Sequence, residues 1–329
     1  MAKPLKHTAA SLGEAVLLSK IAALARPPRR GAVLLGPGDD CAAVRFPKNK
    51  VLLATSDDMV EGTHFLEPRA DAGRLAAKLL RINLSDLAGM GDANPVCVLC
   101  SASFPADTPA YWLEEFVRTL ARECRLFKAP LAGGNLSRGD KFHLSITAIG
   151  AARSEGIIKR AGARPGDLLF TLGSLGEAKA GLELYYGKSR KVSGTFRDAL
   201  LNAFWRPEPL FREARALSRK KLAMALMDNS DGLYKSAGYL AEAGNCGAEI
   251  FLNDNCASPV LKAYCRKVGA DWRTYALSGG EDYGLVFAVP PGKAALLRRT
   301  LPQARLVGKF ISGTGVSSGA VDAKPYEHF

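Results

Sequence analysis

The sequence predicts a two-domain protein in which α-helices and β-strands alternate in both halves, an α/β or α+β fold. A length of 329 residues is sufficient for two domains of ordinary size, and 47% hydrophobic against 23% charged residues is typical of a globular protein. Segments of helical and strand periodicity follow one another along the chain. No apolar run approaches the ~18 residues that span a bilayer, so we expect no transmembrane segment and no membrane partner.

The first half is expected to begin with an amphipathic helix from Ser11 to Ala25, opened by a capping box of Ser11 and Glu14. This pattern argues against a secretory signal and favours a cytoplasmic protein. Hydrophobic periodicity then predicts strands at 51–55, 96–104 and 142–150, with helices at 75–90 and 112–126.

The second half is also expected to alternate strands and helices. We expect strands at 167–172, 223–227 and 285–289, and helices at 177–186 and 233–243. A Gly- and Pro-containing turn at 162–167 begins this series, which places the domain boundary near 151–160 and predicts domains 1–152 and 153–329.

Cysteine and charge patterns narrow the classes of function. Cys97 and Cys100 have the spacing of a metal-binding pair, but they lie in an apolar strand-like run without a second such pair or a nearby histidine, so buried thiols are expected. The net charge of +13 is spread along the chain and comes with no nucleic-acid-binding motif. We therefore expect no nucleic-acid partner.

Five short segments combine carboxylates with Gly, Ser or Asn, mostly at predicted strand ends: 36–40, 55–58, 83–86, 228–232 and 279–282. Each has an ordinary structural explanation, since Asp and Gly form turns, Asp231 could cap the following helix and Asp86 could be a solvated helix residue. As a set they favour a cation site, because clustered carboxylates repel unless a cation compensates them, and Mg²⁺ prefers oxygen ligands while it bridges phosphates. Ser230 and Asp231 before a helix would add N–H groups suited to a phosphate.

Other catalytic motifs are missing. The chain contains no GxxxxGK[ST] phosphate-binding loop, no protein-kinase motif set and no HExxH. The sequence therefore predicts a magnesium–nucleotide site assembled from short Asp-rich loops.

Seven motifs follow one another along the chain: GPGDD (36–40), TSDDMVEGTHF (55–65), NLSDLAGMGD (83–92), GGNLSRG (133–139), KRAGARPGD (159–167), MDNSDGL (227–233) and LSGGEDYGLVF (277–287). Their order resembles the thiamine-monophosphate kinase family, within the superfamily of aminoimidazole ribonucleotide synthetase, selenophosphate synthetase and the hydrogenase maturation protein HypE. The closing Tyr326–Phe329 segment also resembles this family's C-terminal aromatic segment.

The resemblance implies a PurM-like fold and a homodimer. An N-terminal ATP- and metal-binding domain would close a β-barrel with a second copy, and a C-terminal domain would cover the nucleotide. The implied reaction is transfer of the γ-phosphoryl group of ATP to thiamine monophosphate, with Mg²⁺, giving thiamine diphosphate.

The resemblance also implies roles for individual residues. Transfer would depend on Asp57, Asp228 and Arg160, nucleotide binding on Gly134, Asn135, Arg160 and Ser230, and binding of the thiamine moiety on His64, Glu281 and Tyr326. The implied metal ligands are Asp40, Thr55, Asp57, Asp86, Asn135, Asp228 and Asp231. These residue types suit the chemistry, because phosphoryl transfer requires mainly positioning and charge neutralisation.

One position departs from the family pattern: Asn135 stands where the family has a metal-binding Asp. Asn keeps a carbonyl oxygen but removes a negative charge. Asn135 could still bind the metal more weakly, Asp39 or Asp58 could supply the charge, or the activity could be lost or changed. The alternatives to the kinase are therefore another ATP-dependent member of the superfamily and a homologue that binds nucleotide or thiamine phosphates without turnover.

Overall fold

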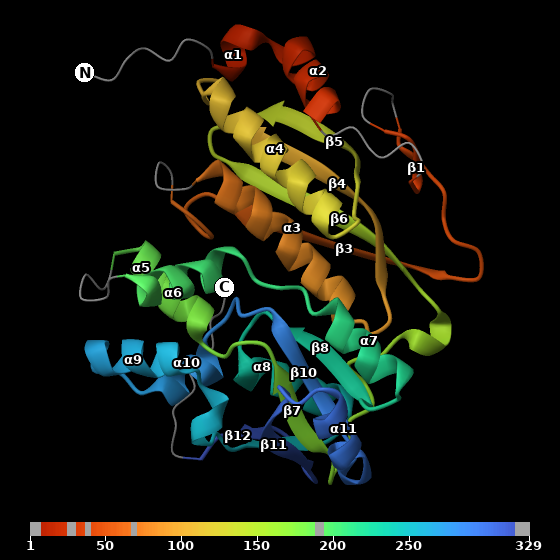
Figure 1. Ribbon diagram of the computed structural model, residues 1–329, viewed down its shortest axis with the longest axis vertical. Coiled ribbons are helices and arrows are strands. Elements are labelled where there is room, and N and C mark those ends of the chain that lie inside the picture. Colours follow the sequence, from red (N-terminus) through yellow and green to blue (C-terminus); the bar gives the residue numbers. More distant parts are fainter. Residues whose placement is uncertain (1–7, 25–30, 37–40, 67–70, 188–193, 320–329) are drawn as a thin grey trace. The chain divides into compact units, whose positions relative to one another are not determined.

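The computed structural model describes residues 8–24, 31–36, 41–66, 71–187 and 194–319 and divides them into two compact units (Figure 1). The first unit contains the described residues up to Leu87 together with Asn94–Arg153, and the second contains Ala88–Ala93 and the described residues from Ser154 onward. Among these residues, no helix is both long enough and apolar enough to cross a bilayer.

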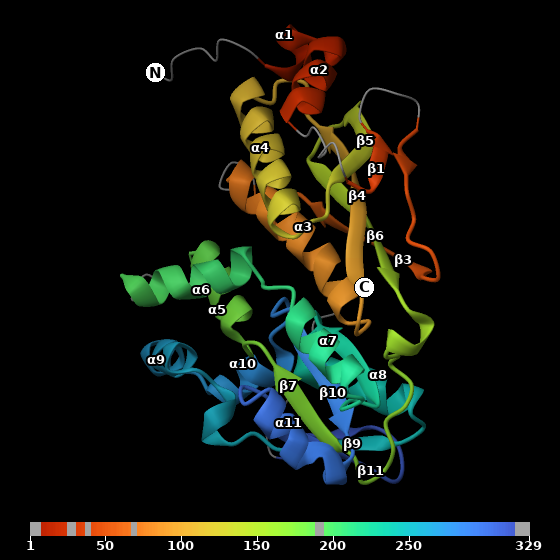
Figure 2. The same ribbon diagram turned by 45° about the vertical axis from the view of Figure 1, so that its right-hand side comes forward.

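The first unit is a four-stranded sheet of order β3-β6-β4-β5 with helices on one face (Figure 2). Its elements are α1 (Ala9–Leu12), α2 (Glu14–Leu24), β1 (Val33–Leu35), β2 (Ala43–Val44), β3 (Val51–Val60), α3 (Ala72–Ala88), β4 (Asn94–Phe104), α4 (Ala110–Leu126), β5 (Leu131–Arg138) and β6 (His143–Ala152). β5 pairs with β4 in parallel, whereas β6 pairs with both β3 and β4 in antiparallel fashion.

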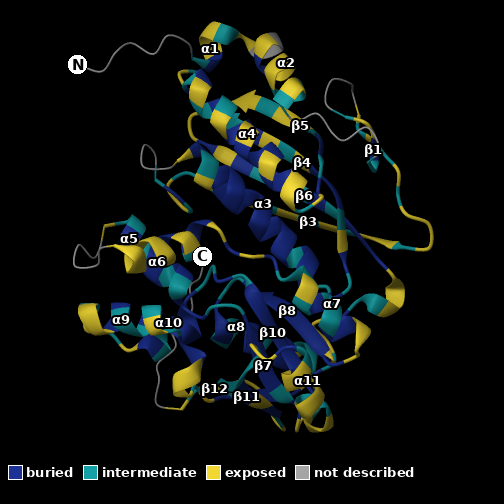
Figure 3. Cartoon of the chain, viewed as in Figure 1, coloured by how far each residue is buried: buried dark blue, intermediate teal, exposed yellow. Residues whose placement is uncertain are grey.

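Helix α3 is almost completely buried along most of its length (Figure 3). From Leu75 to Ala88 every residue is buried except Asp86, which is half-buried. The buried charge of Arg81 is compensated by Glu123 of α4, whose Oε2 accepts from Arg81 Nε at 2.9 Å. Removing one partner of such a pair would leave an uncompensated charge in the interior, so this bond holds the two helices together.

In this unit one sequence-based expectation is wrong, and one strand was not predicted. The single helix expected from Ser11 is interrupted at Gly13, whose φ of 75° ends α1, and the capping box is formed by Thr8 and Ser11. The segment 131–138 is a strand, although its Gly- and Asn-rich composition disfavours one. Gly134 fits there because its backbone approaches Cys100 so closely that a Cβ atom would lie 1.8 Å from the Cys100 carbonyl oxygen.

The second unit is a six-stranded sheet of order β12-β9-β11-β7-β10-β8, antiparallel except for the β12–β9 pair. Its strands are β7 (Leu168–Leu172), β8 (Ala225–Asn229), β9 (Gly247–Ile250), β10 (Gly284–Val289), β11 (Arg305–Ile311) and β12 (Val316–Ser317). Its α-helices are α5 (Glu177–Tyr185), α6 (Thr195–Trp205), α7 (Phe211–Arg219), α8 (Leu233–Ala243), α9 (Pro259–Val268), α10 (Trp272–Ser278) and α11 (Ala294–Thr300), and short 3₁₀ turns lie at 154–156, 254–256 and 291–293.

Alternate residues of this sheet enter two separate cores. Phe170 and Phe287 pack with α7 and α11 on one face, whereas Val286 packs with α5, α6, α8, α9 and α10 on the other. Because helices cover both faces, β8 and β10 are fully buried and read as nearly continuous apolar runs. The polar residues at the ends of β8 and β10 are therefore attached to strands that are packed on both faces.

Candidate functional site

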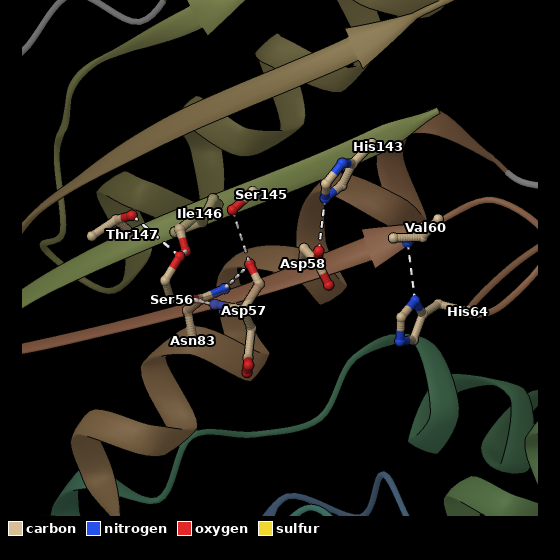
Figure 4. A network of polar contacts seen from close by, with 10 residues as sticks. All are labelled: Ser56, Asp57, Asp58, Val60, His64, Asn83, His143, Ser145, Ile146 and Thr147. Carbon is tan, nitrogen blue, oxygen red and sulfur yellow. Dashed lines mark hydrogen bonds and ion pairs between the residues drawn. The ribbon is translucent and has the colours of Figure 1, made fainter. Parts of the chain in front are cut away.

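In the first unit, expected site residues meet where β3 packs on the C-terminal half of α3. The Thr55 hydroxyl donates to Asp86 Oδ2 at 2.5 Å. Two residues further along β3, the Asp57 backbone N–H donates to Asn83 Oδ1 at 2.8 Å, and Asn83 Nδ2 donates to the Asp57 carbonyl at 3.4 Å (Figure 4). Asn83 and Asp86 are three residues apart and so lie on one face of α3. The strand and the helix thus hold Thr55, Asp57 and Asp86 in one place.

These contacts show the surroundings of Asp86, which the sequence had left open. Asp86 is bonded to β3 and is not a solvated helix residue. The expectation that the acidic segments are loops is wrong for 55–58, which lies inside β3, whereas 83–86 lies inside α3, in agreement with the helix expected at 75–90. Sequence reasoning did not single out Asn83, although its spacing from Asp86 was an available signal.

Asn135 lies on the other face of this sheet. The register aligns Asp57 with Ile146, Cys100 and Gly134, and it aligns Asp58 with Ser145, Ser101 and Asn135. Directly paired residues share a face and successive residues alternate. Within this chain, the sheet therefore brings Asn135 to the face of Asp58 and away from the face of Asp57 and Thr55.

Within one chain, Asp58 lies too far from Asn135 to supply the missing charge to the same metal ion. Asp58 on β3 and Asn135 on β5 are separated by three strand spacings of about 4.8 Å each. Asp58 Oδ2 is instead 2.7 Å from His143 Nε2 on the neighbouring strand (Figure 4). A separation of this size is too large for both side chains to bind one metal ion, whose oxygen ligands lie at about 2.1 Å.

His64 follows β3 in a turn that fixes its ring. Its Nδ1 accepts from the Val60 N–H at 3.0 Å (Figure 4). In the neutral imidazole the proton is then on Nε2, because Nδ1 is the acceptor. The turn therefore determines which nitrogen of His64 can donate to a ligand.

In the second unit, Asp228 and Asn229 end β8, and Ser230 and Asp231 form the turn into α8. Asp228 is buried, while Ser230 and Asp231 are half-buried. The N-cap residue of α8 is Gly232, with φ 94°, which has no side chain to cap the helix. Asp231 is thus not the N-cap residue of α8.

A second loop, 279–283, is bound to this turn. The Glu281 N–H donates to the Ser230 carbonyl at 2.6 Å, and the Tyr283 N–H donates to the Asn229 carbonyl at 3.0 Å. Glu281 and Tyr283 both have positive φ, 67° and 49°, a backbone conformation that costs about 1–2 kcal/mol for a non-glycine residue. Such strain is typical of positions that a structure holds for function.

A cavity of about 240 Å³ opens beside this loop, with Glu177, Arg206, Glu208, Asp282 and Tyr283 in its lining. Glu177 and Glu208 place two carboxylates against the guanidinium of Arg206, and this acidic lining suits a cationic or donor-rich ligand. Burial raises the pKa of Asp282 to about 8, and hydrogen bonds from the Gly176 and Ala178 N–H groups oppose this increase.

Arg160 belongs to the second unit, and Gly134 to the first. The exposed Arg160 guanidinium lies over the ring of Tyr239 on α8, 5.7 Å from its centroid. The backbone of the same segment is fixed to β8, because the Leu226 N–H donates to the Lys159 carbonyl at 3.1 Å. Two expected site residues, Asp40 and Tyr326, lie outside the described residues, as does Asp39.

The donors of each unit, taken separately, fit a magnesium ion that is held mainly by its substrate. They are oxygen atoms only: Thr55, Asp57 and Asp86 in the first unit, Asp228 and Asp231 in the second. Within the ranges that the structure describes, no three acidic, His or Cys side chains form a metal-binding group by themselves. Mg²⁺ commonly uses one or two carboxylates with waters and phosphates, so a complete protein cage is not required.

The chain matches two family models, one over each half. Residues 38–152 match the AIR synthase related protein, N-terminal domain, and residues 164–320 match the AIR synthase related protein, C-terminal domain. The chain is therefore a two-domain AIR synthase related protein. The E. coli HypE hydrogenase maturation protein, at 19% identity and a TM-score of 0.73 over 95% of each chain, shares this fold.

Relatives with higher sequence identity show to which family the chain belongs. The thiamine-monophosphate kinase of Escherichia coli (strain K12) is 36% identical over 259 residues, 78% of this chain and 77% of its own length. A solved structure described as AaThiL complexed with AMPPCP and TMP superposes with a TM-score of 0.77 at 32% identity and covers 97% of both chains. This chain belongs to the thiamine-monophosphate kinase family.

Proposed function

We propose that this chain transfers the γ-phosphoryl group of ATP to the phosphate of thiamine monophosphate, giving thiamine diphosphate and ADP. The observation that carries the proposal is the agreement over 97% of both chains with a relative solved together with AMPPCP and TMP. AMPPCP is an analogue of ATP, so that relative holds both classes of substrate that this reaction requires.

The residues of the first unit support a role in holding phosphates. Thr55 and Asp86 present a hydroxyl and a carboxylate 2.5 Å apart, and Asn83 fixes the backbone of Asp57 beside them. We propose that Thr55, Asp57 and Asp86 hold Mg²⁺, which when bound would neutralise phosphate charge. Phosphoryl transfer asks for positioning and charge neutralisation more than for a protein nucleophile, and these anchored side chains supply positioning.

The residues of the second unit support nucleotide and acceptor binding. Asp228 and Asp231 offer further carboxylates for Mg²⁺, and Arg160 offers a fixed positive charge for a phosphate. The strained loop contains Glu281, and the next two residues of the same loop, Asp282 and Tyr283, line the acidic cavity. A carboxylate in these surroundings favours the positively charged thiazolium ring of thiamine monophosphate over a neutral ring.

The test is a turnover assay with ATP, Mg²⁺ and thiamine monophosphate, in which thiamine diphosphate and ADP are both quantified by chromatography. We expect equimolar products, none when EDTA replaces Mg²⁺, and none when unphosphorylated thiamine replaces the acceptor. Absence of thiamine diphosphate at every Mg²⁺ concentration would refute the proposal.

A binding protein without turnover is the second candidate, and Asn135 is the observation that favours it. If calorimetry detects thiamine monophosphate binding while the turnover assay stays silent, this candidate replaces the kinase. If filter binding detects salt-sensitive affinity for DNA or RNA, the expectation that the net charge of +13 does not serve nucleic-acid binding is wrong.

We also propose a homodimer and a cytoplasmic location. The face of the four-stranded sheet that lies away from α3 leaves Leu52 and Leu99 exposed, 56% and 37% respectively, and an apolar strand surface of this kind favours a second copy as a cover. All seven cysteines are free, which suits a reducing compartment. Light scattering coupled to gel filtration would test the dimer, and a mass of one chain would refute it.

A further inference from the structure

The buried carboxylate of Asp282 caps a helix that is more than a hundred residues away in the sequence. Its Oδ2 accepts from the Gly176 N–H at 2.6 Å, and its Oδ1 accepts from the Ala178 N–H at 3.2 Å. These groups belong to the N-terminus of α5, whose own N-cap residue is Gly176 and has no side chain to cap it. Asp282 therefore satisfies N–H groups that a local Ser, Thr or Asp satisfies in most helices.

The two neighbours of Asp282 carry the backbone strain of this loop. Glu281 and Tyr283 have φ values of 67° and 49°, so the chain at Asp282 is held in left-handed conformation on both sides. Gly280 permits the close approach, because a Cβ atom there would lie 2.9 Å from the Ser230 carbonyl oxygen. An unsupported loop would relax from these conformations, so contacts on either side must hold it.

The supports lie on two opposite sides. The Glu281 and Tyr283 N–H groups bond to the β8–α8 turn at 2.6 and 3.0 Å. Asp282 bonds to α5 on the other side, and the charges of Glu177 and Arg305 act on it with opposite sign. Both Asp282 oxygens are engaged by backbone donors and the residue is only 6% exposed. This arrangement assigns Asp282 to the support of the loop and not to direct contact with phosphate.

We propose that Asp282 is a positioning residue for Glu281, which it holds in its strained conformation by anchoring the loop 279–283 to the N-terminus of α5. The inference rests on the proposed function for the identity of the ligand, a cationic heterocycle on the phosphoryl acceptor. Loss of the anchor should therefore weaken binding of the acceptor much more than binding of ATP.

The experiment compares Asp282→Asn with Asp167→Asn. Asp167 is a matched control, since it is also buried, belongs to the same unit and accepts a backbone bond, from the Arg164 N–H at 3.0 Å. The amide of Asn can accept only one of the two α5 bonds and turns a donor toward the other. We expect KM for thiamine monophosphate to rise at least about tenfold in Asp282→Asn, with KM for ATP changed less than about twofold, and neither to change in Asp167→Asn.

A purely structural role would lower the melting temperature of both variants and leave the ratio of the two KM values unchanged, and this result would overturn the inference. Hydrogen exchange supplies a readout that needs neither turnover nor a stable variant. In the wild-type protein, the Glu281 amide should open no more readily than the Gly176 and Ala178 amides, because the proposal makes the Glu281–Ser230 bond depend on the Asp282 anchor. If the Glu281 amide exchanges more than about tenfold faster than the Gly176 amide, the two segments are not coupled and the inference is refuted, whether or not the wild type phosphorylates thiamine monophosphate.

Discussion

Gly134 allows a sharp separation of a structural from a functional role, because an adjacent glycine of the same strand serves as its control. A Cβ atom at Gly134 would lie 1.8 Å from the Cys100 carbonyl oxygen and 2.7 Å from its carbonyl carbon. A Cβ atom at Gly133 would meet nothing closer than the Leu99 side chain at 3.4 Å, an ordinary contact. Both residues belong to β5 and pair with β4, so Gly134→Ala and Gly133→Ala differ mainly in this clash.

The magnitude follows from the strand pairing. To accept the Gly134→Ala methyl group, β5 must move away from β4 by more than 1 Å at this point, which breaks about two backbone hydrogen bonds of about 1 kcal/mol each. Strain and lost packing add to this, so we expect Gly134→Ala to lower the free energy of unfolding by about 2–4 kcal/mol. Gly133→Ala should be neutral or slightly stabilising, since Ala restricts the unfolded chain by about 0.4–1 kcal/mol.

Urea unfolding followed by circular dichroism measures both variants, and hydrogen exchange of the β4 and β5 amides assigns the change to the first unit. ATP affinity, measured by calorimetry below the unfolding transition, gives the second readout. Equal stability of the two variants together with weaker ATP binding only in Gly134→Ala would refute the packing argument and leave nucleotide contact as the sole reason for glycine at 134.

Three further predictions concern charge. Asn135→Asp should leave the Mg²⁺ concentration that gives half-maximal rate unchanged, because Asn135 lies on the sheet face opposite Thr55 and Asp57; a lower requirement would place Asn135 in the metal shell. Asp228→Asn should reduce kcat by about 100-fold or more, since charge stabilisation by a metal contributes several kcal/mol to the barrier, and near-normal turnover would remove Asp228 from the proposed site. Burial raises the pKa of Asp92, but hydrogen bonds and charges of Arg219 and Arg215 outweigh this and lower it below 3.8. Because the folded-state pKa is lowered, the stability that Asp92 contributes is present above pH 3.8 and is lost as the pH falls through the folded value. Asp92→Asn should thus cost about 1–3 kcal/mol at pH 7 and progressively less below pH 3.8 in acid-unfolding titrations, and a cost that does not depend on pH would contradict this account.

Hydrophobic periodicity predicted most of the buried helices and strands, because burial requires apolar residues at the positions that face the core. The helix expected at 233–243 has these bounds in the structure, and the strand expected at 285–289 differs by one residue. The helix packs on a face of the six-stranded sheet and the strand lies within that sheet, so both have a strong apolar pattern. Strand β5 gives no such signal, because it consists largely of Gly and polar residues and depends on pairing with β4, which is distant in the sequence.

By itself, the sequence determined the two-domain α/β class, the family, and the residue types that a phosphate- and metal-binding protein requires. Only the tertiary structure decided which of these residues share a surface. Strand register places Asn135 and Asp57 on opposite faces of one sheet, and a shift of a single residue would reverse this, so no local pattern could show it. The role of Asp282 likewise depends on α5, whose N-terminal N–H groups meet its carboxylate only after both strands β7 and β10 have paired.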